Sequence, residues 1–213
     1  MAISAYDWNV VIAGSWNRAI LTPQGIGKFV FGLTDSTSLQ LELSINSIDP
    51  PRVTYDDVSV RVFSNRIILD CATCSDVNMD KSLRYGRTSL SQLIYTPVQA
   101  AGFNFRYRFR DSGTIDLTKS LMQSTNYMSK YDYTPVSSNV IRAIKYEAGT
   151  LNIQTDWEGD DKFALLFNFH FNSLQPESLQ SWLNPNFTDI RSTIDNIKAE
   201  LLNGLDQETD EDE

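Results

Sequence analysis

The sequence is poor in the residues on which most catalytic and metal sites depend. It contains one histidine and two cysteines in 213 residues. A catalytic serine or cysteine usually needs a histidine base beside it, and a structural zinc site needs four ligands. The nucleophile elbow, the phosphate-binding loop, the dinucleotide-binding glycine pattern and the zinc-protease motif are all absent from the sequence. We therefore expect no cofactor and no metal, and the sequence does not favour an enzyme.

Long apolar segments are missing as well. No run approaches the roughly 20 apolar residues that a membrane-spanning helix needs. The start, Met1–Trp8, lacks both the basic and the apolar region of a secretory signal. Two cysteines without such a signal suit a reducing compartment. We therefore expect a soluble cytoplasmic protein that makes no contact with membranes.

Basic residues are outnumbered by acidic ones, mainly at the C-terminus. The formal net charge is −9, and the segment 206–213 supplies six carboxylates and no basic residue. Without that segment the chain carries −3. We expect residues 206–213 to form a disordered acidic tail. The overall acidic balance disfavours nucleic acid as a partner, although only weakly once the tail is set aside.

Aromatic residues are plentiful, and two short segments arrange them in the same way. Phe103–Tyr107 and Phe167–Phe171 alternate aromatic and polar residues with a period of two. This period is typical of a strand with one apolar face and one polar face. If the two strands lie side by side, their polar faces form one stripe that suits phosphate or carboxylate groups. The candidate binding residues on this stripe are Asn104, Arg106, Arg108, Arg110, Asn168 and His170.

A purely structural interpretation of the same stripe is also open. Arginines on the polar face of a sheet commonly pair with acidic residues across strands, such as Asp70, or lie over apolar neighbours. The single histidine, His170, is expected to be buried among side chains of the sheet. It should form a hydrogen bond with a residue of the 103–110 strand and act structurally.

The periodicity of the remaining segments predicts an α+β fold. Strands are expected at 8–14, 39–45, 58–63 and 66–71, with Ser64-Asn65 as a hairpin turn. An extended segment is expected at 16–21, and helices are expected at 24–31, after the capping pair Thr22-Pro23, and at 77–95. A three-stranded antiparallel meander should follow between 140 and 171. Next come a short helix at Pro176 and a terminal amphipathic helix. The sheet is expected to be largely antiparallel, with the helices packed on one face.

The domain organisation follows from this order of elements. Residues 1–205 are expected to form a single domain. Two sub-units, 1–110 and 138–205, are possible within it, joined by a long polar connection at 111–137. Loops of this length inside a compact domain are uncommon and are often functional.

Cys71 and Cys74 form the one motif with a recognisable redox pattern. A Cys-x-x-Cys pair between a strand and a helix is typical of thioredoxin-like sites, where the helix terminus stabilises a thiolate. The strand before this pair belongs to an antiparallel hairpin rather than to a βαβ unit. We therefore favour two small apolar residues at the end of a strand, with thiol redox chemistry as the alternative.

Several phrases of the sequence resemble a known group of proteins. They are Trp16–Pro23 with Phe31-Gly32-Leu33, Thr96–Phe105, and Phe167–His170. Together they are similar to sporadically distributed bacterial proteins of unassigned function. The resemblance implies a bacterial protein, and it implies no activity, substrate or catalytic residue.

Three functional hypotheses remain. The first is a non-catalytic protein-interaction subunit of a bacterial cytoplasmic assembly, with a protein partner or self-association. An apolar stripe on the terminal helix, Ile190, Ile194, Ile197 and Leu201, would be one place for a partner to dock. The alternative is a nucleic-acid-binding accessory protein that uses Arg106, Arg108 and Arg110. The third is a thiol redox protein at Cys71 and Cys74.

Overall fold

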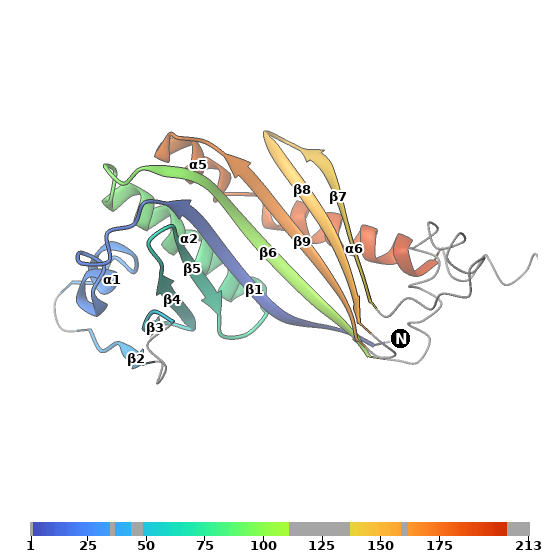
Figure 1. Cartoon of the computed structure of the whole chain (residues 1–213), viewed down its shortest axis with the longest axis horizontal. Coiled ribbons are helices and arrows are strands. Elements are labelled where there is room, and N and C mark those ends of the chain that lie inside the picture. Colours follow the sequence, from blue (N-terminus) through green and yellow to red (C-terminus); the bar gives the residue numbers. More distant parts are fainter. Residues whose placement is uncertain (1, 35–36, 44–48, 111–136, 159–161, 204–213) are drawn as a thin grey trace, which may run out of the picture.

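The computed structural model describes residues 2–34, 37–43, 49–110, 137–158 and 162–203, and these residues form an α+β fold of two layers (Figure 1). One layer is an antiparallel sheet, and the other consists of helices that lie behind it in Figure 1. The strands are β1 (Ala2–Gly14), β2 (Gln40–Glu42), β3 (Arg52–Tyr55), β4 (Val58–Val62), β5 (Arg66–Cys71), β6 (Val98–Arg110), β7 (Ser137–Tyr146), β8 (Gly149–Glu158) and β9 (Lys162–Asn172). The helices are α1 (Pro23–Phe29), α2 (Asp76–Gln92), α5 (Pro176–Trp182) and α6 (Phe187–Asn203).

The strand order of the sheet is β2-β3-β4-β5-β1-β6-β9-β8-β7. The predicted α+β class, the antiparallel sheet, the C-terminal meander and the terminal helix are therefore confirmed. Strand β6 pairs with β9 in an antiparallel register from Ala100 opposite Asn172 to Phe109 opposite Phe163. The two aromatic segments of the sequence thus lie side by side. Both proposed sub-units contribute strands to the same continuous sheet.

The core lies between the sheet and the helices, and phenylalanine dominates it. Alternate residues of β6 and β9 point toward the helices, and Phe103, Phe105, Phe167 and Phe169 are fully buried there. The rings of Phe103 and Phe169 stack with centroids 4.9 Å apart. Burying a side chain of this size contributes about 1.5–3 kcal/mol. The period-two pattern in the sequence therefore marks the strands that hold the two layers together.

Strand β1 is longer than the sequence predicts. It begins at Ala2 and pairs with β5 on one side and with β6 on the other. The register against β6 shifts between Ala5 and Asp7, so that Tyr6 is an extra, bulged residue. This bulge breaks the alternation of apolar and polar residues, which is why the pattern alone revealed only the second half of the strand.

The segment 16–21 was wrongly predicted to be extended. The backbone amides of Ile20 and Leu21 both donate to the carbonyl oxygen of Asn17, which turns the chain into α1. Thr22 then caps this helix, as predicted, by accepting from the Gly25 amide at 3.2 Å. A Cβ atom at Gly25 would lie 1.9 Å from the Ile20 carbonyl oxygen. A residue without a side chain is therefore required at this close helix entry.

Helix α2 follows the predicted periodicity. Ser75 caps it by accepting from the Asn78 amide at 3.3 Å. Met79, Leu83 and Leu90 are buried on the face that meets the sheet. Gly86 brings the helix close to its neighbours, because a Cβ atom there would lie 3.1 Å from Cδ1 of Leu183.

Helix α6 uses its apolar stripe within the protein. Ile190 and Ile194 are completely buried in the core, and Ile197 packs against it. Arg191 donates to the Tyr107 hydroxyl at 3.0 Å and so ties the helix to β6. These three isoleucines are therefore not available as the docking stripe that we had considered. The side chain of Leu201, residues 111–136 of the predicted connection 111–137 and the acidic tail 206–213 lie outside the described residues.

Candidate functional site

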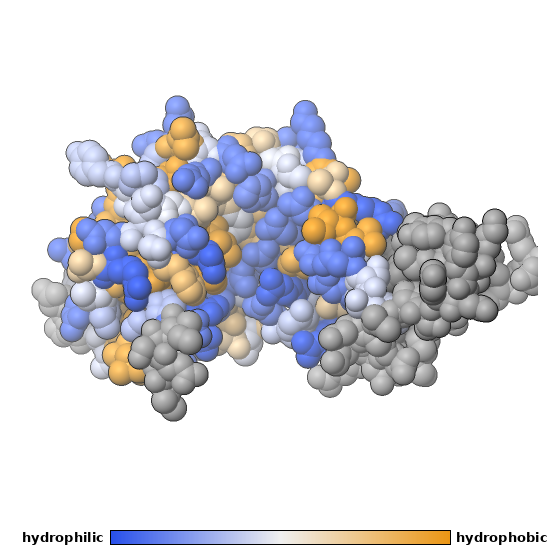
Figure 2. Space-filling view, viewed as in Figure 1, coloured by the Kyte–Doolittle hydropathy of each residue, from blue (hydrophilic) through white to orange (hydrophobic). Residues whose placement is uncertain are grey.

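The face of the sheet opposite the helices, which we call the open face, carries a continuous row of polar side chains. The register places these residues opposite one another on adjacent strands, and the row ends at β8 because β7 has the apolar Ala143 at this position. The members of this polar row, in strand order from β2 to β8, are Gln40, Thr54, Ser59, Asp70, Asn9, Asn104, Asn168 and Asn152. Figure 2 shows this face, with hydrophilic residues over the middle of the sheet.

The four asparagines of the polar row are linked by hydrogen bonds that all run in one direction. Asn152 donates to Asn168 at 2.9 Å, and Asn168 donates to Asn104 at 2.7 Å. Asn104 in turn donates to Asn9 at 2.8 Å, and Asn9 donates to a carboxylate oxygen of Asp7 at 3.1 Å. We call these five residues the amide relay. Aligned hydrogen bonds of this kind polarise one another, and the chain ends on a negative charge that strengthens the last bond.

The relay and its surroundings neutralise most of the charge on the open face. Arg106, which lies opposite Asp7 on β6, forms an ion pair with it. Arg61 forms an ion pair with Asp70, with Nη2 and Oδ2 2.8 Å apart. Burial nevertheless raises the pKa of Asp70, although Arg61 opposes this shift. The predicted stripe is therefore a balanced polar surface and not a continuous basic one.

Arg108 differs from the other arginines of the stripe. Its guanidinium lies over the ring of Tyr6, 4.4 Å from the ring centroid. Among the described residues, no acidic side chain forms an ion pair with it. The bulge in β1 places Tyr6 beside Arg108, so a local irregularity of the backbone orients this side chain. Bulges next to functional sites commonly orient a side chain in this way.

The structure brings several of the predicted residues together. Asn104 and Asn168 lie directly opposite each other, and Arg106 is the next open-face residue along β6. The backbone of Arg110 pairs with Ala2 at the end of β6. Its side chain lies outside the described part.

The expectation for His170 was wrong in two respects. The side chain is half-buried rather than buried, because the open face has no covering layer in the described residues. Its Nε2 atom forms a hydrogen bond with Asn172 of the same strand at 3.0 Å, and not with a residue of β6. The residue opposite it on β6 is Gly102, which has no side chain to offer.

The sequence analysis missed part of the surface. Asn9, Asn152 and Asp7 were not singled out, although each occupies a polar position of an alternating strand. Asparagine is depleted in strands, so its recurrence at such positions was an available signal. Asp156 was not named among the candidate site residues either. It lies within β8 and accepts hydrogen bonds from Asn139 and Gln154.

Cys71 and Cys74 occupy an environment that disfavours thiolates. Both are free thiols. Burial raises the pKa of Cys71 to about 12, and burial also raises the pKa of Cys74. The Cys71 thiol lies 3.3 Å from the Ser82 hydroxyl and 4.0 Å from the Met79 sulfur. A reactive redox pair would instead require a stabilised thiolate.

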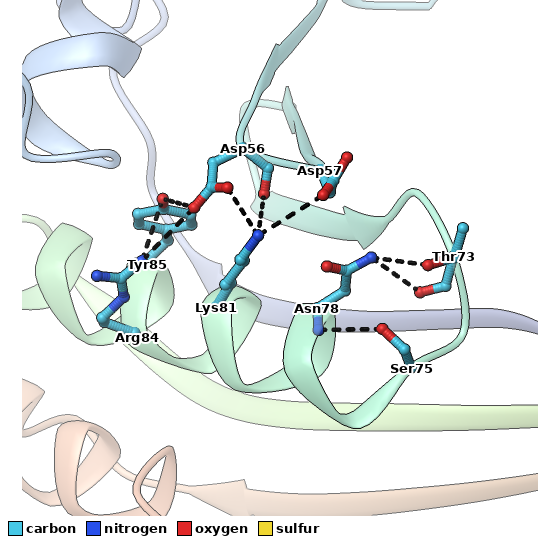
Figure 3. A network of polar contacts seen from close by, with 8 residues as sticks. All are labelled: Asp56, Asp57, Thr73, Ser75, Asn78, Lys81, Arg84 and Tyr85. Carbon is cyan, nitrogen blue, oxygen red and sulfur yellow. Dashed lines mark hydrogen bonds and ion pairs between the residues drawn. The ribbon is translucent and has the colours of Figure 1, made fainter.

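A second polar cluster lies between the β3–β4 turn and α2 (Figure 3). Lys81 contacts Oδ1 of Asp56 at 2.7 Å and Oδ2 of Asp57 at 3.6 Å. Tyr85 donates to Asp56 at 3.2 Å, and its hydroxyl accepts from Arg84 at the same distance. The hydrogen bond from Lys81 is the largest cause of the lowered pKa of Asp56. Each charge in this cluster has a partner, so the cluster anchors the turn to the helix.

Two features that are common in other proteins are absent from the described residues, namely a cluster of metal ligands and a membrane-spanning helix. No group of three or more histidine, cysteine, aspartate or glutamate side chains in this part of the chain is placed to hold a metal ion. Among the same residues, no helix is both long enough and apolar enough to cross a membrane. Comparisons of the chain with protein-family models, with curated proteins and with solved structures find no match.

Proposed function

We propose that this chain is a non-catalytic protein-interaction subunit of a bacterial cytoplasmic assembly, and that its partner docks on the open face. The amide relay carries this proposal. Asn9 and Asn104 are 7% and 9% exposed, so two of the four asparagines of the relay are nearly buried within an otherwise open surface. A face that only contacts solvent does not require asparagines at matching positions on four neighbouring strands, so this arrangement favours a binding surface.

The relay leaves hydrogen-bonding capacity for a partner. Each asparagine amide has two N–H donors and two acceptor positions on its oxygen. The relay uses one donor of each asparagine and one acceptor position of Asn9, Asn104 and Asn168. The remaining groups form a rigid and uncharged array, which suits the peptide groups and polar side chains of another protein. Rigidity lowers the entropy that is lost on binding.

The charges on this face support a protein partner more than a nucleic acid. Nucleic-acid binding depends on cations that are free to replace counterions around phosphates. Arg106 and Arg61 are already paired with Asp7 and Asp70. The aromatic residues of β6 point into the core, where they cannot stack with bases.

The proposal is tested by placing one bulky charge on each face of the protein. Thr150 lies on the open face opposite His170, whereas Ser192 is exposed on α6. Tagged wild-type protein, Thr150→Arg and Ser192→Arg are used for capture from the native host, and any partner is then purified and titrated. We expect wild type and Ser192→Arg to bind the same partner and Thr150→Arg to lose it.

Two results would count against this function. One is a strictly monomeric wild-type protein, by light scattering, that captures no partner. The other is binding that survives Thr150→Arg and is lost in Ser192→Arg, which would place the interface on the helices. Salt-sensitive binding of oligonucleotides, measured by fluorescence anisotropy and weakened by Arg108→Ala, would favour the nucleic-acid alternative instead.

A further inference from the structure

A hollow with a volume of about 670 Å³ opens beside Arg108 at one end of the open face. It is lined by polar residues of β6, β7 and β8 and by two aromatic residues. Its volume lies within the range of about 300–1,000 Å³ that is usual for sites of small ligands. The hollow therefore has the size of a binding site, and its charges indicate what it can bind.

The floor of the hollow is a small residue between two opposite charges. In the register of the sheet, Ala164 on β9 lies between Arg108 on β6 and Asp156 on β8. Two strand spacings separate Arg108 from Asp156, or about 10 Å between their Cα atoms. No ion pair joins these two residues in the described structure. The short side chain of Ala164 leaves the space between them open.

Arg108 forms the positive wall of the hollow, and its side chain is already oriented in the absence of a ligand. Arg108 is exposed, and its stacking on Tyr6 fixes the plane of the guanidinium. A guanidinium held in one plane can donate two parallel hydrogen bonds to a carboxylate or a phosphate. Arg106, two residues away, cannot do the same because it is paired with Asp7.

Asp156 forms the negative wall of the hollow, and uncharged side chains orient its carboxylate. The side-chain amide of Gln154 lies 3.0 Å from both carboxylate oxygens of Asp156, and Asn139 donates to one of them. These amides fix the position of the carboxylate without cancelling its charge. Asp156 therefore keeps a net negative charge that can attract a cation, and one of its acceptor positions remains available.

The end of the hollow is apolar. Trp157 and Phe163, which lie opposite each other on β8 and β9, complete its lining. Because successive residues of a strand point to opposite faces, these two aromatic side chains lie on the helix side of the sheet, where Phe163 is buried in the core and Trp157 packs against it. On the open face the ligand is therefore bounded by Arg108, Ala164 and Asp156.

We infer that this hollow binds a zwitterion in which a carboxylate and an ammonium group are separated by a short methylene chain. The carboxylate binds Arg108, the ammonium group binds Asp156, and the chain lies over Ala164. Two sources share this chemistry, namely a free ω-amino acid and the C-terminal lysine of a polypeptide. The inference goes beyond the proposed function, because it concerns a separate site and does not require a docked partner.

The experiment is a titration of the full chain with 6-aminohexanoate, followed by NMR at the side-chain amides of Gln154 and Asn139. We expect saturable shifts at these signals. Hexanoate and hexylamine, which each carry a single charge, should bind at least about tenfold more weakly, because each loses a charged hydrogen bond. A peptide that ends in lysine, compared with its C-terminal amide, distinguishes the two sources.

Three variants and a matched control test the assignment. Arg108→Gln and Asp156→Asn should each weaken binding of 6-aminohexanoate about tenfold. Ala164→Leu should abolish binding by filling the floor. Arg66 is the control, because it also lies over an aromatic ring, 4.5 Å from the centroid of Phe63, and its partner in the register on β1 is the uncharged Ala13. Arg66→Gln should leave binding unchanged.

Several results would overturn the inference. They are the absence of saturable shifts with 6-aminohexanoate, equal affinity for hexanoate, and unchanged binding in a folded Arg108→Gln or Asp156→Asn variant. Near-native amide spectra of the variants verify that they are folded. If Ala164→Leu fails this check, the two charge variants still decide.

Discussion

Asparagine is an uncommon residue inside a sheet, because its side chain competes for backbone hydrogen bonds and packs poorly against neighbours. In this protein the amide relay removes that disadvantage by giving each side chain a partner on the next strand. Asn104 is the central member, since it accepts from Asn168 and donates to Asn9. The stability of the open face should therefore depend on this residue more than on the outer members.

Replacing Asn104 with alanine should lower the free energy of unfolding by about 1–3 kcal/mol, because it leaves the buried Asn9 and the half-buried Asn168 each without a hydrogen-bond partner. Asn152→Ala, at the half-buried start of the relay, removes a single hydrogen bond and should cost about 0.5–1.5 kcal/mol. Urea unfolding of both variants measures the difference. Equal costs would show that the relay does not act as a connected chain.

The thiol of Cys71 is a second residue with a definite chemical expectation. Its pKa of about 12 means that it is protonated at pH 8, where a free cysteine is partly ionised. Iodoacetamide should therefore modify Cys71 in the folded protein much more slowly than in the urea-unfolded protein. The rate should rise only as the pH approaches the pKa. Mass spectrometry of a Cys74→Ala variant isolates this residue, and rapid modification at neutral pH would restore the redox hypothesis.

Among the secondary elements, the β3–β4 hairpin contains the most strained turn. Asp56 and Asp57 both adopt left-handed backbone angles, with φ of 48° and 64°. Two-residue hairpins with such angles prefer asparagine followed by glycine. The cluster in Figure 3 explains why Asp56 occupies the first position, since it holds Lys81 and Tyr85 of α2.

Asp57→Gly should therefore raise the free energy of unfolding by about 1 kcal/mol, because glycine adopts the left-handed region without strain. The exposed Asp57 carboxylate lies 3.6 Å from Lys81, so its loss should cost little. Asp56→Gly is the matched control. This substitution relieves the same kind of strain but removes the contacts of Asp56 with Lys81 and Tyr85 of α2. It should therefore not raise the free energy of unfolding. Chemical unfolding measures the stability of both variants. A lower stability of Asp57→Gly than of wild type would show that the ion pair between Asp57 and Lys81 contributes more than the backbone strain costs.

The elements that the sequence predicted well are those whose signal is local. The hairpin around Ser64-Asn65 and the capped starts of α1 and α2 depend on neighbouring residues alone. Strand β1 was half missed because Tyr6 interrupts its alternation, and 16–21 was wrong because the carbonyl of Asn17 accepts two backbone amides there.

The candidate surface was only partly predictable for a related reason. Asn104, Arg108 and Asn168 follow from the period of two aromatic strands, and their adjacency was stated as a condition. Asp7, Asn9 and Asn152 join them only because the strand order sets β1 between β5 and β6 and sets β8 beside β9. A sequence does not display cross-strand register, so the relay could not be derived from it.

At the scale of the whole molecule, the sheet has its most protected strands in the middle and its least protected strands at the edges. Strands β1, β6 and β9 each pair on both sides, and β6 carries the fully buried Phe103 and Phe105. Strand β2 has three exposed residues at one edge, and most side chains of β7 are exposed at the other. Local opening requires less free energy where fewer apolar contacts must be broken.

Hydrogen exchange followed by mass spectrometry should show this gradient directly. We expect peptides that cover β6 to exchange most slowly, at a rate close to that set by global unfolding, because opening a central strand breaks pairing on both sides. Peptides that cover β2 and β7 should exchange orders of magnitude faster. Exchange measured near the denaturation midpoint serves as the control, because the exchange rates of all segments should converge there on the rate set by global unfolding. Protection of β7 as strong as that of β6 would instead mean that this edge is paired in solution.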